Sequence, residues 1–317
     1  MAITANELIF RKPKWNSDSQ RGGPMSTVAY TTGQRGNVFS DLTEAELASG
    51  ETVRRKVFIH AAHSGVLPLV GAKVALSSET PLSGRVRLIP GTQRDLESDL
   101  TGTERIYGIG TLASASNPTQ ITVDVETGAG ADDVFQTGDT IRIWTTGGGE
   151  IATVQAVAWT GDQAVIDLTA SLTGTYSAGD FAASCIMAAS IAPEIMDVIT
   201  AGSVQINASS LTPDGLGSLE EIVTLTFSSP TGFSAVSDLW GSLGSGVTTT
   251  DFAPTNSAYG VPRWTIPVAA WTVTAEPGDT VQFSVHPAAI GVWMERITPA
   301  GNAAGDDNTE LWIGAGS

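Results

Sequence analysis

The chain has 317 residues and a net charge of −17 at pH 7, with 16 Lys and Arg against 33 Asp and Glu. It is 41% hydrophobic and 15% charged, which excludes disorder along the whole chain and allows two domains of ordinary size. A protein that neutralises phosphates needs Lys and Arg on its contact face, so the acidic balance argues against binding to nucleic acid or to an anionic membrane.

The first 36 residues predict an extended N-terminal docking arm. This segment is polar and rich in turn residues, and it carries the apolar anchors Leu8, Ile9, Phe10 and Trp15. Such an arm cannot build a core of its own. Two placements are open: the arm lies across a neighbouring subunit, with these anchors at the interface, or it folds back on its own domain.

The rest of the chain is dominated by alternation of apolar and polar residues, the pattern of half-buried strands. Helical periodicity is confined to residues 42–47, with Ser40 and Asp41 as candidate N-caps, and to residues 193–199. The fold class is therefore mainly β. The clearest predicted strands cover residues 52–60, 84–89, 120–125, 139–144, 221–227, 271–274 and 279–285.

A Gly-Asp pair precedes several of these segments. Gly supplies a positive φ and Asp can bond to nearby backbone, so each pair is typical of a turn that leads into the next strand. Three of the four pairs lie between residues 107 and 185, where they separate short strands spaced as in a small barrel or sandwich. The pairs occupy residues 138–139, 161–162, 179–180 and 278–279.

This spacing predicts three parts. Residues 1–36 form the arm, and residues 107–188 form an inserted small β-barrel module. Residues 37–106 and 189–317 together form a discontinuous, Ig-like β-sandwich domain, because neither flank alone has enough strands for two covered sheets.

Charge is distributed unevenly along the chain. Of the 16 basic residues, 14 lie between Arg11 and Arg142, which gives a net charge of −3 for residues 1–158 and −14 for residues 159–317. This asymmetry suits head-to-tail stacking of copies, and it is also typical of a solvated acidic face.

Catalytic motifs are missing from the sequence. It has no phosphate-binding glycine loop and no nucleophile elbow. His60, His63 and His286 have no accompanying carboxylates at ligand spacing, which favours structural or surface roles over a metal site. Cys185, the one cysteine, cannot form an intramolecular disulfide and is interpreted as a small buried hydrophobe. We expect no enzyme activity, no catalytic residue, no cofactor and no metal.

Other features admit an alternative. The acidic residues of 306–310 suggest a calcium loop but lack its full spacing, so a turn between terminal strands is favoured. Paired carboxylates for glycoside hydrolysis stay open because sequence does not give distances in space. Five tryptophans favour core or interface over a sugar-stacking platform. They are Trp240, Trp264, Trp271, Trp293 and Trp312.

No signal-peptide core is expected at the N-terminus, because the first residues become charged and aromatic after a few apolar positions. The cleanest apolar run, residues 66–76, is too short to cross a bilayer. We therefore expect a soluble chain made in a cytoplasm.

Three stretches carry a resemblance to a known family. They are ELIFRKP at residues 7–13 followed by GGPMS at 22–26, the run from residue 37 to 60 that ends in VRRKVFIH, and HPAAIGVWMERITPAG at 286–301. In these stretches the chain resembles virion structural proteins of tailed bacteriophages, especially Mu-like phages with long tails. The similarity covers both flanks and little of residues 107–185.

The resemblance implies a non-enzymatic, self-assembling component of the phage tail, in the tube or in the tail-tip and baseplate region. Its partners would be copies of itself, as a ring or stack, and other tail proteins, and its location the virion, after synthesis in the host bacterial cytoplasm. The resemblance transfers no site residues. A glycan- or receptor-binding module that takes host-surface polysaccharide and a capsid decoration protein remain the alternatives.

Overall fold

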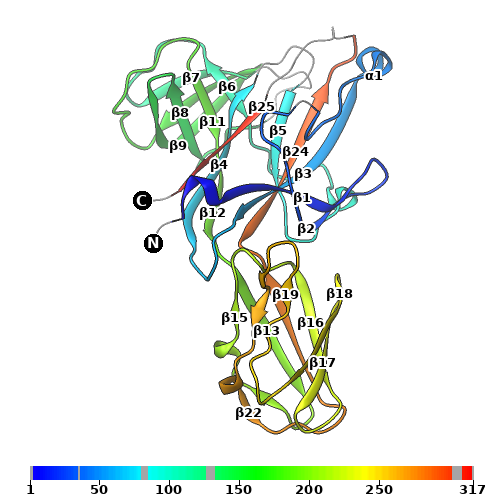
Figure 1. The fold of residues 1–317 in the computed structure, drawn as a ribbon. Coiled ribbons are helices and arrows are strands. Elements are labelled where there is room, and N and C mark those ends of the chain that lie inside the picture. Colours follow the sequence, from blue (N-terminus) through cyan, green and yellow to red (C-terminus); the bar gives the residue numbers. More distant parts are fainter. Residues whose placement is uncertain (1–2, 35, 80–84, 126–132, 302–308, 316–317) are drawn as a thin grey trace.

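The computed structural model describes residues 3–34, 36–79, 85–125, 133–301 and 309–315. In these ranges the chain is mainly β, as predicted, and its strands form several sheets and one closed barrel (Figure 1). Short 3-10 turns cover Ala5–Glu7, Glu97–Asp99, Ala208–Ser210 and Val268–Ala270.

Sheet A is antiparallel and has the strand order β2-β1-β3-β24-β5. Its central strands, β3 and β24, pair over ten residues, from Glu51 opposite Thr298 to His60 opposite Ala289. The strands are β1 (Leu8–Asn16), β2 (Arg21–Ala29), β3 (Glu51–Ala61), β24 (Ala289–Thr298) and β5 (Arg85–Pro90).

The one α-helix in the described ranges, α1 (Glu44–Ser49), lies directly before β3. Its N-cap is Thr43, whose side chain accepts a hydrogen bond from the Glu46 backbone N–H. The Glu46 carboxylate reaches back to the Thr43 N–H, completing a capping box. The prediction of Ser40 and Asp41 as caps is therefore wrong by three and two residues, because the capping box fixes the helix start at Thr43.

Sheet B packs against one face of sheet A. It contains β12 (Ile186–Ile191), β4 (Leu69–Glu79) and β25 (Thr309–Gly314), with β4 in the centre. A continuous apolar core joins Ile59 and Met294 of sheet A to Val74 and Leu76 of β4. Trp144 of the barrel reaches the same core, so these three parts share one interior.

The barrel closes with the strand order β10-β7-β6-β11-β8-β9. Apolar residues at alternate positions fill its interior around the fully buried Phe135. The alternation that predicted strands at residues 120–125 and 139–144 is confirmed here. The strands are β6 (Ile109–Leu112), β7 (Gln120–Asp124), β8 (Thr140–Thr145), β9 (Gly148–Thr160), β10 (Gln163–Leu168) and β11 (Phe181–Ser184).

The Gly-Asp turns are confirmed. The glycines of all four pairs have positive φ, between 59° and 98°. The carboxylates of Asp139, Asp180 and Asp279 each accept a hydrogen bond from the backbone N–H three residues earlier, at 2.7 to 2.9 Å. Local hydrogen bonds therefore support these turns, and Asp139 and Asp279 also bind Arg105 and Ser203 from distant parts of the chain.

Residues 194–286 form a separate lobe, called lobe D, at the bottom of the view in Figure 1. Its main sheet, sheet D, has the order β13-β23-β16-β17-β18, with β13 (Glu194–Ala201), β23 (Thr280–His286), β16 (Glu221–Phe227), β17 (Gly232–Ser237) and β18 (Gly241–Val247). Three short ladders cover its inner side: β14 (Gln205–Ile206) with β22 (Trp271–Val273), β15 (Thr212–Pro213) with β21 (Trp264–Thr265), and β19 (Thr255–Asn256) with β20 (Val261–Pro262).

The helix predicted at residues 193–199 is wrong, because this segment is strand β13. It pairs with β23, and a bulge between Met196 and Ile199 interrupts the pairing. The bulge residue Asp197 has a φ of 55°. An extra residue breaks strict alternation, which produced the misleading helical spacing.

The chain crosses between lobe D and the rest of the protein twice, at Ala192–Pro193 and at Pro287–Ala288. Each crossing is short and contains a buried proline, whose ring fixes φ. Two such connections restrict how lobe D can move.

Candidate functional site

Buried ionisable side chains gather on one face of sheet A. Arg54, Lys56 and His60 share this face of β3, because residues two apart in a strand point the same way. Glu295 and Trp293 lie beside them on β24. We call these five residues the polar face; Lys56 and His60 are 0% exposed and Glu295 is 2% exposed. Buried charges require partners, and each of these has one.

Glu295 lies between two arginines on neighbouring strands. Its Oε1 accepts from Arg54 Nε at 2.7 Å, and its Oε2 accepts from Arg87 Nε at 3.0 Å. The sheet register places Arg54 and Arg87 directly opposite Glu295 on either side. The three side chains form an ion-pair row across β3, β24 and β5.

Lys56 is enclosed at the centre of the polar face. Its Nζ donates to Asp95 Oδ1 at 2.5 Å, to the Gly23 carbonyl at 2.9 Å and to the Asp95 carbonyl at 3.2 Å. Trp293 Nε1 donates to the other carboxylate oxygen of Asp95 at 2.7 Å. Burial lowers the pKa of Lys56, and the bond to Asp95 opposes that effect.

His60 connects the polar face to lobe D. Arg11 Nε donates to His60 Nδ1 at 3.1 Å, so Nε2 carries the proton and donates to the Gly215 carbonyl at 2.7 Å. The bond from Arg11 requires neutral imidazole, because Nδ1 can accept a hydrogen bond only when it carries no proton. Burial is the main cause that lowers the pKa of His60, to about 4. The hydrogen bond to the Gly215 carbonyl opposes this effect, and the charge of Arg11 adds to it.

A second ionic contact joins lobe D to sheet A through Glu220, which is 1% exposed. Its carboxylate accepts from Arg94 Nε at 2.6 Å and pairs with His286 Nδ1 at 2.5 Å. Arg94 also pairs with Asp238 at 2.7 Å. The bond to Glu220 raises the pKa of His286, so this histidine favours the charged form.

Apolar packing seals the same junction. Met25, Phe58 and Ala289 from sheet A cluster with Leu219 and the half-buried Trp240 of lobe D. Exclusion of water strengthens the ion pairs around this cluster. The junction therefore holds lobe D by packing and by directional bonds together.

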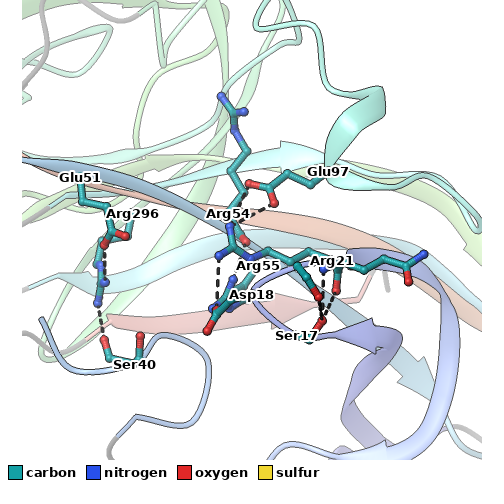
Figure 2. Close-up of polar contacts among 11 residues, drawn as sticks. Ser17, Asp18, Arg21, Ser40, Glu51, Arg54, Arg55, Glu97 and Arg296 are labelled. Atoms are coloured by element: carbon teal, nitrogen blue, oxygen red, sulfur yellow. Dashed lines mark hydrogen bonds and ion pairs between the residues drawn. The ribbon is translucent and has the colours of Figure 1, made fainter. Parts of the chain in front are cut away.

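A more exposed set of ion pairs lies at the edge of sheet A (Figure 2). Asp18, in the turn between β1 and β2, pairs with Arg55 at 2.7 Å and with Arg21 at 3.4 Å. Arg21 also pairs with Glu97 at 3.1 Å. These contacts hold the β1–β2 hairpin, but Asp18 is 87% exposed, so its two ion pairs contribute little to stability.

The predicted arm residues lie on strand β1, which pairs with β3 of the same chain. Phe10 packs on the shared core and Leu8 on a smaller apolar cluster, while Ile9 lies opposite His60. Trp15 covers Gly23, where a Cβ would lie 2.1 Å from the indole. This is the folded-back placement; docking on a neighbouring subunit stays a prediction.

The three histidines all lie near the junction of lobe D, but the structure does not assemble them into a metal site. His63 pairs with Glu7, away from the pairs of His60 and His286. In the described ranges, no group of three or more His, Cys, Asp or Glu side chains could hold a metal ion. Cys185 is buried, as predicted, and burial raises the pKa of its thiol to about 12.

The remaining candidates from the sequence are the calcium-like loop and the tryptophans. Asp306, Asp307 and Asn308 of the calcium-like loop lie outside the described residues. Trp264 and Trp293 are fully buried, and the other three tryptophans of the set are half-buried. None of the five is an exposed platform, which agrees with the core interpretation.

Sequence reasoning missed the polar face. The signal was present in residues 52–60, where Arg54 and Lys56 interrupt a strand that is otherwise apolar toward its end. Charges on a central strand indicate buried partners. The sequence does not show which residues these partners are, because they are far away along the chain. Asp95 lies 39 residues from Lys56, and Glu295 lies 241 residues from Arg54.

Comparisons with known proteins leave the family open: the chain matches no family model, no curated protein and no solved structure. Among the residues that the structure describes, no helix is long and apolar enough to cross a membrane.

Proposed function

We propose that the chain is a non-enzymatic structural protein of a phage tail that assembles with copies of itself, in the tube or the tail-tip and baseplate region. The sequence resemblance on both flanks supports this assignment. The arrangement of strands supports an Ig-like parent sandwich with the barrel as an inserted module, since β6–β11 follow one another between strands of sheets A and B.

The observation that carries the self-association in this proposal is the outer face of sheet D. Three successive rows of paired residues on this face are uncharged. The exposed Ile199, Gln282, Val236 and Ser242 lie in the middle row, with half-buried Thr224 between them. Ile199 is 59% exposed and Val236 48% exposed.

These uncharged rows matter because the chain as a whole is acidic. Residues 192–288 contain nine Asp and Glu against one Arg, and the whole chain has a net charge of −17. Copies of such a chain repel one another wherever charged surfaces meet. The paired Ile, Val, Thr, Ser and Gln residues of these rows lessen that repulsion, with the exposed Asp197 of the β13 bulge at the edge of the face, so a second copy is the partner that the face fits.

A matched pair of substitutions tests this surface. Gln282→Glu adds one charge of nearly the same shape to the face, and Gln155→Glu adds the same charge on the exposed side of β9 in the barrel. We expect Gln282→Glu to weaken self-association at least tenfold in sedimentation velocity and Gln155→Glu to leave it unchanged. Equal behaviour of both variants would remove sheet D as the assembly surface.

Location is tested separately by mass spectrometry of purified virions. The proposal expects the chain in the tail fraction in multiple copies. Its absence from virions would overturn the tail assignment.

A further inference from the structure

We propose that Lys56 and Asp95 form an intramolecular amide bond, a covalent cross-link between strand β3 and the loop that follows β5. The inference concerns the chemistry of the polar face and does not depend on the proposed function.

The two reacting groups are already in contact. Lys56 Nζ lies 2.5 Å from Asp95 Oδ1, and the Lys56 side chain is 0% exposed. Hydrogen bonds from Nζ to two backbone carbonyls fix the amine, and the Thr92 N–H holds Asp95 Oδ1 from the opposite side at 3.1 Å. Fixed neighbours of this kind react as if at very high concentration.

The surroundings of Lys56 are closely packed, and the Asp95 side chain is 13% exposed. The rings of Phe58 and Trp293 lie 4.7 and 5.7 Å from Lys56 Nζ. Gly291 leaves space for the lysine stem, because a Cβ there would lie 2.8 Å from Lys56 Cε. Burial lowers the pKa of Lys56, which favours the neutral amine that the reaction needs, and the hydrogen bond to Asp95 opposes this effect.

The condensation needs no other reactant. Nζ gives one proton to Asp95 Oδ1, which leaves a neutral amine beside a carboxylic acid. The nitrogen lone pair then attacks Cγ, the C–N bond forms, and the carbonyl electron pair moves to Oδ2. Nitrogen gives a second proton to Oδ1, the C–O bond breaks, and one water leaves. The products are one amide and one water.

Trp293 takes the position of an oxyanion donor in this step. Its Nε1–H points at Asp95 Oδ2, the oxygen on which negative charge develops, at 2.7 Å. A fixed donor at that oxygen stabilises the tetrahedral intermediate. Lys56 and Trp293 of the polar face therefore supply the nucleophile and the charge stabiliser, and Asp95 of the loop after β5 supplies the electrophile.

Intact-mass spectrometry of the purified, denatured full chain tests the proposal. We expect the chain to be lighter than its sequence by one water. Trypsin should then release a branched product that joins residues 56–73 to residues 95–105, without cleavage after Lys56. A cyclised aspartate also loses water but gives no branched product, so that result would overturn the proposal, as would the full unmodified mass.

Two lysine variants test which lysine forms the amide bond. Lys56→Arg keeps the positive charge but cannot form the amide, so its mass should match its sequence. Lys73→Arg, at a lysine whose Nζ donates to the Gly71 carbonyl at 3.2 Å, should keep the loss of one water. If Lys56→Arg does not fold, the presence or absence of the branched peptide in the unaltered chain still decides whether the amide bond forms. A loss of water that persists in Lys56→Arg would contradict the assignment.

Discussion

The barrel buries Phe135, Ile141 and Ile166 among other apolar side chains, whereas the polar face of sheet A buries Lys56 and Glu295 among charged partners. Apolar burial stabilises without direction, so it fills a barrel but does not select one partner over another. Buried ion pairs are costly unless every partner is in place. The difference indicates that the barrel interior provides stability and that the polar face fixes the positions of strands and of lobe D.

The largest effect is expected in the barrel. Phe135→Ala removes a fully buried ring that stacks with Trp159 and leaves a cavity. We expect a loss of about 4 kcal/mol in the free energy of unfolding, measured by urea denaturation. A loss below about 1 kcal/mol would show that the barrel interior collapses around the gap and is not close-packed.

The polar face responds in another way. Glu295→Ala removes the buried carboxylate that pairs with both Arg54 and Arg87, and we expect a loss of about 3 kcal/mol in the free energy of unfolding. Replacing all three by Met, Leu and Met should recover much of that stability, because the repulsion and the desolvation cost both disappear. Failure of the triple variant to exceed Glu295→Ala would contradict the ion-pair interpretation.

Acid should act on the junction of lobe D. The pKa of His60 is about 4 when folded, below its ordinary value of 6.5, so the unfolded chain binds more protons between these values. Stability from this group is complete above pH 6.5 and falls by about 3 kcal/mol as the pH drops to 4. The slope of stability against pH should be shallower in His60→Gln; NMR titration of His60 near 6.5 would contradict this account.

His286 has the opposite sign. The bond to Glu220 raises its pKa, so the stability from this pair is present below the ordinary value of 6.5 and is lost as the pH rises through the raised pKa. The two histidines therefore give the junction a maximum of stability at intermediate pH.

The smallest effect on stability is expected at the exposed ion pairs of Asp18. Asp18→Ala removes pairs with Arg21 and Arg55, but the Asp18 side chain is 87% exposed. We expect a loss below about 1 kcal/mol, decreasing with added salt. If Asp18→Ala lost as much stability as Glu295→Ala, solvent exposure would not explain the difference between the ion pairs of Asp18 and those of the polar face.

The sequence pattern correctly predicted several individual strands and turns. The alternation at residues 221–227 matches β16 residue for residue, and each Gly-Asp pair forms a turn within four residues of chain. The helix at residues 193–199 was wrong because pairing of β13 with β23 overrides a short helical spacing.

The polar face could not be predicted because its partners meet only through tertiary pairing. Arg54 contacts Glu295 because β3 and β24 share a register, and His60 contacts Gly215 because lobe D packs on sheet A. Charge counts along the sequence give the number of such groups but not their distances.

The most direct test of the tail assignment is the mass of the purified full chain in solution, by light scattering over a concentration series with negative-stain imaging. The account predicts rings or stacks that grow with concentration and that Gln282→Glu disrupts. A chain that stays monomeric at the highest concentration and is also absent from virions would contradict it.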